Sequence, residues 1–501
     1  MRSSWGLLAA WPIVLAVVAC DGGEGGSDPT PQEDMAVPAE DSAVPPAPDA
    51  GPEMPPDAGP PPVAFPDVWG PAPLEDLNPS PDVVEVEIRA TEVDVVIDEN
   101  LTLPMVAYNG QFPGPLLTAK VGDEIIVHFT NEMTQSTTIH WHGLRISDQM
   151  DGNPRIQDPV PGGGTFTYRF VAPEAGSFWY HPHVDANRQV EGGLYAPIVI
   201  RDHHDPAYDL ERSIMLDDIL VDPDRQDFVP FLSSHPEVMH GRHGNILLTN
   251  GRPSERVRSE ATQGQVERWR LVNPANARTQ ELSLRGASFR VIGTDGGLLR
   301  DPYVTERLVI SPGQRFDLEV SYDGPGPVEL ISHVLALDEN DEVVTLEVPV
   351  FAVDVTASDA VPRTVPWPEL PGLPEREVGN EVELVLDAVS DPATGIRWMI
   401  NGEAHRHEPL FTFAEGETVR MRIVNRLGPE HPFHLHGQFF AIVGADGALL
   451  PGLRDTVLVP GLETVEIVAY LDNPGHWMAH CHILEHAELG MMTEIAVEPS
   501  P

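Results

Sequence analysis

Cysteine and lysine are almost missing from this chain of 501 residues, and each shortage excludes a class of protein. Only Cys20 and Cys481 are present, so the fold cannot rest on a framework of disulfides. Lys120 is the single lysine, and 30 basic residues stand against 78 acidic ones, for a net charge of −48. Such a chain has no basic stripe to neutralise phosphates, and we expect no nucleic-acid partner.

Long stretches with the 3.6-residue period of an amphipathic helix are also scarce. Runs that alternate polar and apolar residues recur instead, in a chain with 43 glycines and 52 prolines. This pattern is typical of β-strands with one buried face. The length exceeds what one hydrophobic core usually organises. The sequence therefore predicts an all-β protein of several domains.

Residues 1–20 contain an apolar run that is too short for a membrane span. The run follows Arg2 and is about fifteen residues long, which favours an export signal over a transmembrane helix. It ends in Val17-Val18-Ala19-Cys20, which resembles the lipobox of bacterial lipoproteins; an ordinary signal peptide that happens to contain a cysteine is the alternative. We expect an exported lipoprotein of the cell envelope, on the periplasmic or outer-surface side, that meets a membrane only through its N-terminal lipid anchor.

Residues 21–82 are rich in proline, alanine, glycine and acidic residues, and the first basic residue after them is Arg89. A segment of this composition buries too little apolar surface to fold. We expect a disordered tether that holds the folded part away from a membrane. A role of its acidic side chains in collecting metal ions is the alternative to a plain spacer.

From Val83 onward the chain repeats itself three times. Each copy has an Asn-Gly turn, then a glycine followed nine residues later by an asparagine, then a Pro-Gly turn. The turns are Asn109-Gly110, Asn250-Gly251 and Asn401-Gly402; the pairs are Gly122/Asn131, Gly264/Asn273 and Gly416/Asn425; the second turns are Pro161-Gly162, Pro312-Gly313 and Pro460-Gly461. The repeat predicts three β-domains over residues 83–202, 203–360 and 376–498, with a proline-rich linker at 361–375.

The segment from His480 to Met491 carries the most specific chemistry in the chain. Cys481 stands between His480 and His482, with His486 five residues and Met491 ten residues further on. Thiolate, imidazole and a weak thioether are the donors of a blue-copper electron-transfer site. Side chains alternate between the faces of a strand. Cys481 can therefore bind one metal while its two histidine neighbours reach toward others.

Histidine pairs of the form His-x-His occur in copies one and three and are missing from copy two. A single pair is usually incidental, but four pairs at equivalent positions predict a shared cluster between the first and third domains. They are His140/His142, His181/His183, His434/His436 and His480/His482. Eight imidazoles suffice for three metal ions, two with three ligands and one with two. Imidazole also suits zinc, iron and nickel, and the cysteine favours copper.

These four segments together resemble those of a three-domain multicopper oxidase of the laccase type, over about residues 83–498. The resemblance implies three consecutive cupredoxin-like domains, each a Greek-key β-sandwich, and four copper ions. It assigns the type 1 copper to His431, Cys481 and His486, with Met491 as the axial ligand. It assigns the type 2 copper to His140 and His434. It assigns the type 3 pair to His142, His181, His183, His436, His480 and His482.

The family reaction takes single electrons from a reductant at the type 1 copper and reduces dioxygen to water at the other three. By the same resemblance, electrons enter at the outer edge of His431 and pass through Cys481. Oxygen reduction consumes protons, so a carboxylate near the cluster is required. Asp151 is the candidate, although Asp151-Gly152 is also a typical turn. Some relatives have a glutamate where this chain has Ala487. Glu485, Glu488 or another proton route is left to replace it.

We expect a monomeric enzyme that oxidises phenols or similar organic donors. Other functions compete with this one. A cuprous-ion or other metal oxidase is the first, although the thirteen methionines are scattered and only Met491 and Met492 are adjacent. His235, His240 and His243 with Met239 are a candidate peripheral metal or substrate loop, against the simpler interpretation of a solvated surface. A cupredoxin scaffold without metal and a copper nitrite reductase are disfavoured, because neither needs all the histidines present.

Overall fold

The computed structural model describes residues 70–500, apart from 223, 338–342 and 407. Strands dominate this part of the chain, and its three α-helices are short: α1 (Ala186–Glu191), α2 (His235–His240) and α3 (Leu484–Glu488). The prediction of an all-β protein is confirmed. None of the described helices has the length and apolar character needed to cross a membrane. The predicted signal peptide and residues 21–69 of the predicted tether lie outside the described residues.

The end of the predicted tether differs from the expectation of disorder. The backbones of Ala72 and Leu74 pair with Leu116 at 2.8 and 2.9 Å, and the amide of Leu77 donates to Glu85 at 2.7 Å. Leu74 also packs against the core of the first pair of sheets. Because these residues have backbone partners and one apolar contact, the ordered chain begins before Val83.

Residues 83–201 form two sheets that enclose a core around Trp141 and Tyr168. One sheet has the order β2 (Leu101–Tyr108), β1 (Val83–Asp98), β4 (Glu124–Asn131), β6 (Thr165–Val171). The other has the order β3 (Leu117–Lys120), β8 (Ala196–Arg201), β7 (Gly176–His181), β5 (His140–His142). A short helix, η1 (Asp148–Met150), follows β5.

Residues 210–356 form a second pair of sheets around Trp269. One sheet has the order β13 (Arg252–Pro253), β12 (Ile246–Thr249), β9 (Leu210–Ile219), β15 (Val266–Val272), β20 (Arg315–Ser321), β17 (Ser288–Thr294), β18 (Gly297–Val304). The other has the order β14 (Arg258–Thr262), β22 (Val343–Thr356), β21 (Gly326–Leu337), β16 (Gln280–Arg285), β19 (Leu308–Ile310). A small ribbon of β10 (Val221–Asp222) and β11 (Asp227–Phe228) and the short helix η2 (Ser254–Arg256) complete this part.

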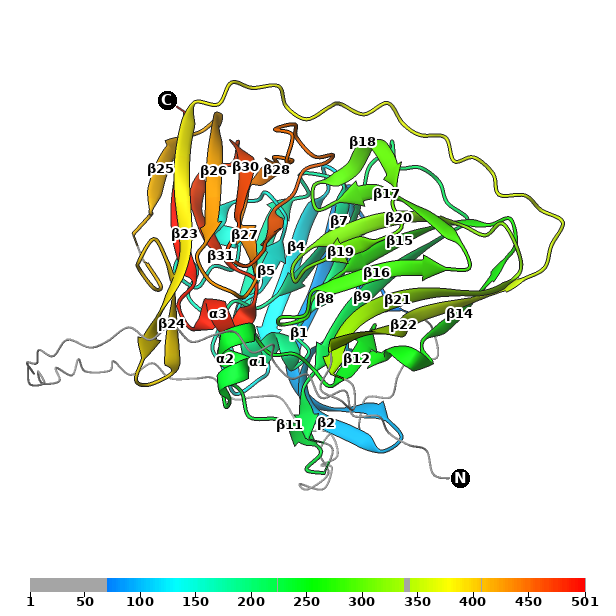
Figure 1. Ribbon diagram of the computed structural model, residues 1–501, viewed down its shortest axis with the longest axis horizontal. Coiled ribbons are helices and arrows are strands. Elements are labelled where there is room, and N and C mark those ends of the chain that lie inside the picture. The colour runs from blue at the N-terminus through cyan, green and yellow to red at the C-terminus, as the bar shows by residue number, and fades with distance from the viewer. Residues whose placement is uncertain (1–69, 223, 338–342, 407, 501) are drawn as a thin grey trace, which may run out of the picture. The chain divides into compact units, whose positions relative to one another are not determined.

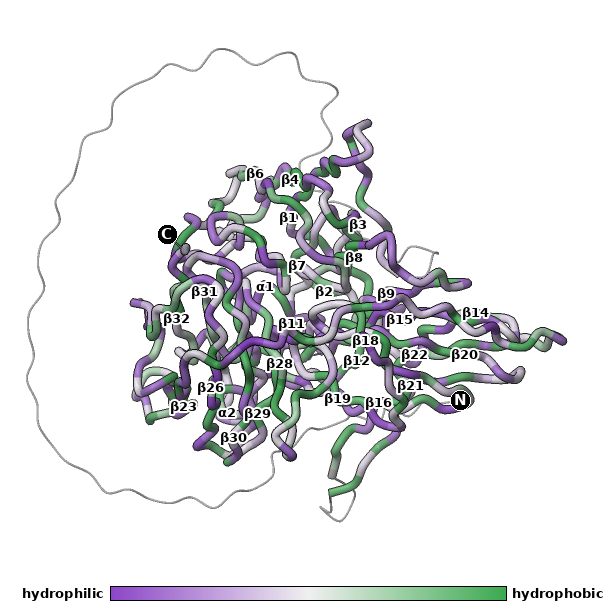
Figure 2. The backbone as a smooth tube through the Cα atoms, turned by 90° about the horizontal axis from the view of Figure 1, so that it is seen from above, coloured by the Kyte–Doolittle hydropathy of each residue, from purple (hydrophilic) through white to green (hydrophobic). Residues whose placement is uncertain are grey.

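Residues 380–498 form the third pair around Trp398 and Trp477. One sheet has the order β24 (Gly395–Ile400), β23 (Asn380–Asp391), β26 (Glu417–Asn425), β30 (Thr464–Leu471), β28 (Phe439–Ile442). The other has the order β25 (Phe411–Ala414), β32 (Met492–Glu498), β31 (Gly475–Cys481), β27 (His431–Leu435), β29 (Thr456–Val459). Residues 357–379, with neither helix nor strand, join this pair to the second, as the long yellow segment of Figure 1 shows. Apolar and polar residues intermix along the strands (Figure 2), as expected of sheets with one buried face.

The repeated sequence landmarks adopt repeated geometry. Asn109, Asn250 and Asn401 have positive φ angles of 52°, 49° and 52°, and each precedes a glycine with positive φ, as a tight hairpin turn of this type requires. In each copy the asparagine amide donates to a backbone carbonyl of the neighbouring strand, at 2.9 to 3.0 Å. A parallel strand pair also recurs: β1 with β4, β9 with β15, and β23 with β26. The domain limits drawn from the sequence stay a prediction.

A buried carboxyl in β9 predicts a pH dependence of stability. Burial raises the pKa of Asp217 to about 7, and its carboxylate accepts a hydrogen bond from the Tyr195 hydroxyl at 2.6 Å. A raised carboxyl pKa favours the folded state below the ordinary value of 3.8, and this stability is lost as the pH rises to about 7. Asp217→Asn lacks this loss, so its melting temperature should gain on that of the wild type between those two pH values and then level off.

The control for this experiment is Asp354→Asn, measured by the same thermal unfolding series. Asp354 is exposed, and a hydrogen bond from Arg258 lowers its pKa, so it stays ionised over the same range. A lowered carboxyl pKa adds stability as the pH rises, so the melting temperature of Asp354→Asn should show no gain on that of the wild type. The absence of a gain for Asp217→Asn as well would contradict the prediction.

Candidate metal centre

Cys481, His431 and His486 form the first group of candidate ligands, called here the sulfur group. Cys481 ends β31, His431 begins β27, and His486 lies in α3. The thiol sulfur lies 3.5 Å from Nδ1 of His431 and 3.7 Å from Nδ1 of His486, and the two nitrogens are 3.1 Å apart. All three side chains are buried. One sulfur and two imidazole nitrogens thus face a common point.

Met491 and Trp398 complete the surroundings of the sulfur group. Met491 is fully buried in the same core cluster as Cys481, and the Cys481 amide donates to its carbonyl at 3.1 Å. The ring of Trp398 lies 4.0 Å from the ring of His486, centroid to centroid. The sulfur group is therefore enclosed by apolar side chains.

The register between β27 and β31 separates the cysteine from the histidines on either side of it. Phe433 pairs with Cys481, and His434 pairs with His480. Since alternate residues of a strand face opposite sides, Cys481 shares one face with His431 and Phe433. His434 and His480 share the other. The predicted alternation is therefore present: the thiol belongs to one group and its neighbours belong to another.

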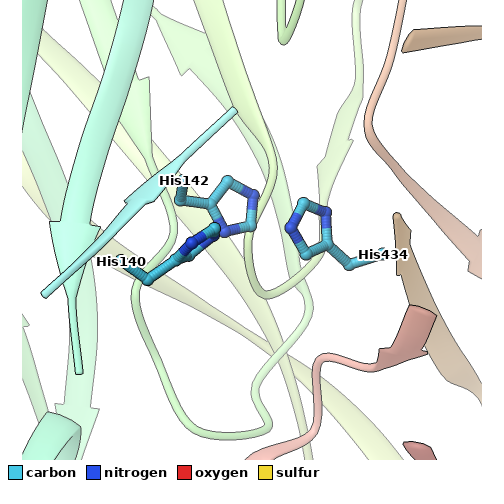
Figure 3. Close-up of side chains that lie close together, drawn as sticks. All are labelled: His140, His142 and His434. Carbon is cyan, nitrogen blue, oxygen red and sulfur yellow. The ribbon is translucent and has the colours of Figure 1, made fainter. Parts of the chain in front are cut away.

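The remaining eight histidines form a second group, called here the imidazole cluster. It contains His140, His142, His181, His183, His434, His436, His480 and His482. β5 and β7 supply the first three, and β27 and β31 supply His434 and His480. Ring centroids are 3.9 Å apart for His142 and His434 and 4.0 Å apart for His140 and His436. Figure 3 shows His140 and His142 facing His434.

Several triads within the imidazole cluster bring one nitrogen from each residue within 4.8 Å of the others. They include His142 with His181 and His482, and His434 with His436 and His480. Segments from the two ends of the folded chain supply them, either in strands or directly after them. The structure therefore brings together all the histidine pairs that the sequence singled out.

The hydrogen bonds of the imidazole cluster fix which ring nitrogen faces inward. Nδ1 of His140, His181, His434 and His480 donates to a backbone carbonyl, at 2.8 to 3.0 Å. A carbonyl can only accept, so Nε2 of these rings carries the free lone pair. Nε2 of both His140 and His434 is buried and has no hydrogen-bond partner among the described residues. Orphaned buried nitrogens of this kind fit a metal.

Burial keeps several imidazoles of the two groups neutral. It lowers the pKa of His431 and of His480 to about 3, and it lowers the pKa of His142, His181 and His482 well below the ordinary value. Neutral imidazole is the form that binds metal ions. Burial also raises the pKa of the Cys481 thiol, so the thiolate needs a cation beside it. The donor set, its protonation and its unpaired nitrogens all fit copper.

Asp151, the predicted carboxylate, lies against the imidazole cluster. It is buried, and its Oδ2 accepts a hydrogen bond from Nδ1 of His436 at 2.8 Å. Its Oδ1 lies 3.2 Å from Nδ1 of His140. Gly152 has a φ of 80°, so a turn is present as well. The turn places the carboxylate between two histidines, and the two interpretations of Asp151 are compatible.

Asp455 is a second carboxylate at the imidazole cluster, and no sequence pattern points to it. Its Oδ1 accepts from Nε2 of His142 at 3.3 Å, and its backbone carbonyl accepts from His434. His142 therefore presents Nδ1, unlike the four rings described above. Burial alone would raise the pKa of Asp455, but Arg315 and His142 hold it well below its usual range. An aspartate before a short apolar strand carries no sequence signal that separates it from a turn residue.

Glu485 has no hydrogen bond to the imidazole cluster among the described residues. Its carboxylate accepts from the Asn276 side chain at 2.8 Å and from the Arg242 amide at 3.0 Å. Burial raises its pKa to about 7. Ala487 is buried and Glu488 is exposed. Among the described residues, the carboxylates with hydrogen bonds to the cluster are thus Asp151 and Asp455.

Helix α2 covers the sulfur group from the side of the second pair of sheets. It lies against α3 and β24 (Figure 1), and the Val238 carbonyl accepts from the Trp398 indole at 3.1 Å. Met239 packs against the core that holds Cys481. His235 is exposed and His240 half-buried. The outer edge of His431, predicted as the electron entry, is itself fully buried.

Comparison with known proteins agrees with this geometry. Three family models, each described as multicopper oxidase, match residues 89–205, 223–327 and 377–501. The chain is 32% identical to the multicopper oxidase MmcO of Mycobacterium tuberculosis, over 77% of this chain and 82% of that one. It is 28% identical to Laccase-1 of Botryotinia fuckeliana, with 80% of each covered.

A solved structure of a Campylobacter jejuni multicopper oxidase, described as a metallo-oxidase, superposes with a TM-score of 0.76. The two chains are 25% identical, over 86% of this chain and 95% of that one. This likeness confirms the predicted cupredoxin-like fold. With family models over most of its length, and a thiol and imidazoles arranged to hold copper, the chain belongs to the multicopper oxidases, the copper-dependent oxidoreductases that pass electrons to dioxygen.

Proposed function

We propose that this oxidase holds four copper ions and takes its electrons from phenols or similar organic donors. His431, Cys481, His486 and Met491 would bind the type 1 copper, and His140 and His434 the type 2 copper. The type 3 pair would be held by His142, His181, His183, His436, His480 and His482. The observation that carries the proposal is the pair of adjacent groups, one with a thiol and one purely of imidazoles, joined through Cys481.

Bound copper would supply the one-electron oxidation of the donor and the reduction of dioxygen to water. The chain itself connects the two groups and encloses them. Cys481 belongs to the sulfur group, and its two neighbours in the chain, His480 and His482, belong to the imidazole cluster. His480 closes a further link, since its Nδ1 donates to the Cys481 carbonyl at 2.8 Å. This covalent path connects the two groups directly.

The surroundings of both groups suit these roles. Both exclude water, because nearly every side chain in them is fully buried. Buried sites strengthen the electrostatic interactions of whatever they bind. Asp151 sits where it can hold a proton beside His436 and His140, which supports its proposed role in proton supply.

A second candidate donor is a metal ion, and helix α2 is the observation that favours it. Met239 is half-buried against the core that holds Cys481, with His235 and His240 on the same helix. Thioether and imidazole suit cuprous ion. Against this stands the sequence, in which the thirteen methionines form no rich segment. Organic donors remain the proposal.

The two donors are separated by steady-state oxygen uptake with a methoxyphenol and with Cu(I). We expect the larger kcat/KM for the phenol, and the pair of variants Met239→Leu and His240→Ala should leave phenol oxidation close to that of the wild type. Met239→Leu keeps volume and apolar character, so it controls for packing over Trp398. A larger kcat/KM for Cu(I), lost in both variants, would assign metal-ion oxidation instead.

The proposed location is the cell envelope, with a lipid on Cys20 and one copy of the chain as the working unit. The support is the sequence pattern of residues 1–20. Cys20→Ser should move the oxidase from the membrane fraction to the soluble exported fraction with unchanged turnover. Equal membrane retention of both forms would contradict the anchor.

A further inference from the structure

The middle repeat has no ligand histidine, yet its loops lie directly against the imidazole cluster. A Cβ added to Gly313 would lie 2.8 Å from the ring of His482. Two residues later Arg315 begins β20, fully buried. Gly313 belongs to the Pro312-Gly313 turn that marks the repeat, and Arg315 follows that turn. The turn that precedes a strand in every copy thus serves, in this copy, as a wall of the cluster.

Arg315 is held by hydrogen bonds from every N–H of its guanidinium. Nη1 and Nη2 donate to the two oxygens of Asp455, at 2.7 and 2.6 Å. The other donors reach the carbonyls of Ser177, Gly313 and Asp295, at 3.0 to 3.2 Å. A guanidinium has five donors in a fixed plane, and all five are used. The side chain is therefore locked against both the first and the third pairs of sheets.

Asp455 links Arg315 to two histidines of the imidazole cluster through hydrogen bonds. Its Oδ1 accepts from Nε2 of His142, and its carbonyl accepts from Nδ1 of His434 at 2.9 Å. Thr456 donates from its hydroxyl to the same Oδ1 at 2.8 Å. His142 and His434 stack on one another, with ring centroids 3.9 Å apart. The orientation of both rings thus depends on where Asp455 is held.

We propose that Arg315 is a positioning residue for the imidazole cluster, through which the middle repeat fixes the inward nitrogens of His142 and His434. The inference rests on the proposed function, because it takes the imidazole cluster to be the copper site. Without Arg315, a buried carboxylate would lose its bidentate partner. Asp455 would then be free to shift, and the two rings with it. Hydrogen-bond partners of metal ligands typically change metal affinity about 10–100-fold when they are removed.

The test compares Arg315→Lys and Asp455→Asn with the wild type, all loaded with copper. Lysine keeps the charge but cannot form the bidentate pair. The measurement is the rate at which a chelator removes copper from the imidazole cluster. This loss is followed by metal content and by the paramagnetic resonance signal of the copper that does not contribute to the blue absorption. We expect loss about 10–100-fold faster in both variants, with the blue absorption of the sulfur group unchanged.

Arg268→Lys is the matched control. Arg268 is also buried in the middle repeat and pairs with Asp317, at 2.5 Å, and with Asp205, neither of which has a hydrogen bond to the cluster among the described residues. It should lower the melting temperature without faster copper loss. Equal copper loss in Arg268→Lys and Arg315→Lys would make the effect one of general stability and overturn the proposal.

Two further outcomes separate this inference from the proposed function. Copper held by both the Arg315 and Asp455 variants as tightly as by the wild type would overturn the role of Arg315 and leave the oxidase intact. A wild-type protein that binds no copper in the imidazole cluster would overturn both. The double variant should lose copper no faster than either single variant, because both changes break the same connection.

Discussion

Replacing Cys481 by serine should abolish the blue absorption and reduce oxidase turnover by more than about 100-fold, beyond the usual effect of removing a residue that only supports a ligand. Serine is close to cysteine in size, so the core around Phe433 and Met491 should keep its packing. Its hydroxyl is a poor donor for the soft copper that a thiolate selects. Copper content, the visible spectrum and oxygen uptake measure the result.

The same variant also tests the separation of the two groups. In the proposed assignment, the copper ions held by the imidazole cluster have no bond to the sulfur of Cys481. Cys481→Ser should therefore keep its other copper ions, so metal content should fall by one ion per chain. The melting temperature of the metal-free variant should stay close to that of the metal-free wild type. A colourless wild type with full copper content would contradict the assignment of Cys481.

The parts of this site that the sequence predicts are the parts encoded locally. An Asn-Gly turn is specified by two adjacent residues, and Asn109 and its two counterparts adopt the expected backbone angles. A His-x-His pair on a strand faces one side for the same local reason, as at His140 and His142. The convergence of the pairs followed from one further step, namely that equivalent positions of a repeat lie at equivalent places in the fold.

The connections between copies had no such local signal. Arg315 and Asp455 are 140 positions apart, and His142 and Asp455 are 313 apart. Each looks like an ordinary charged residue beside a strand when read in sequence. The histidines of helix α2 stand out in the sequence, but the place of this helix over Trp398 depends on how the second pair of sheets meets the third. Such contacts are set by tertiary packing, which single-sequence patterns do not contain.

Asp151→Asn should lower turnover by about 10–100-fold while leaving the blue absorption intact, since Asp151 supports ligands without being one. The carboxylate accepts from Nδ1 of His436 and lies beside Nδ1 of His140. An asparagine offers one acceptor and one donor, so one of the two rings would face an N–H in place of an oxygen. Asparagine also cannot take up or release a proton, and Asp151→Glu restores that ability at the cost of a longer side chain.

Two measurements separate the proton role of Asp151 from simple positioning. Anaerobic bleaching of the blue absorption by the donor reports electron uptake at the sulfur group alone, and it should be equal in the wild type and in both variants. Oxygen uptake reports the whole cycle, and Asp151→Glu should recover part of what Asp151→Asn loses. Because the asparagine variant depends on protons from solvent, its turnover should improve as the pH falls, relative to the wild type. Equal turnover in the two variants at every pH, with faster copper loss in both, would leave Asp151 as a support for His436 and His140 and assign proton supply to another group.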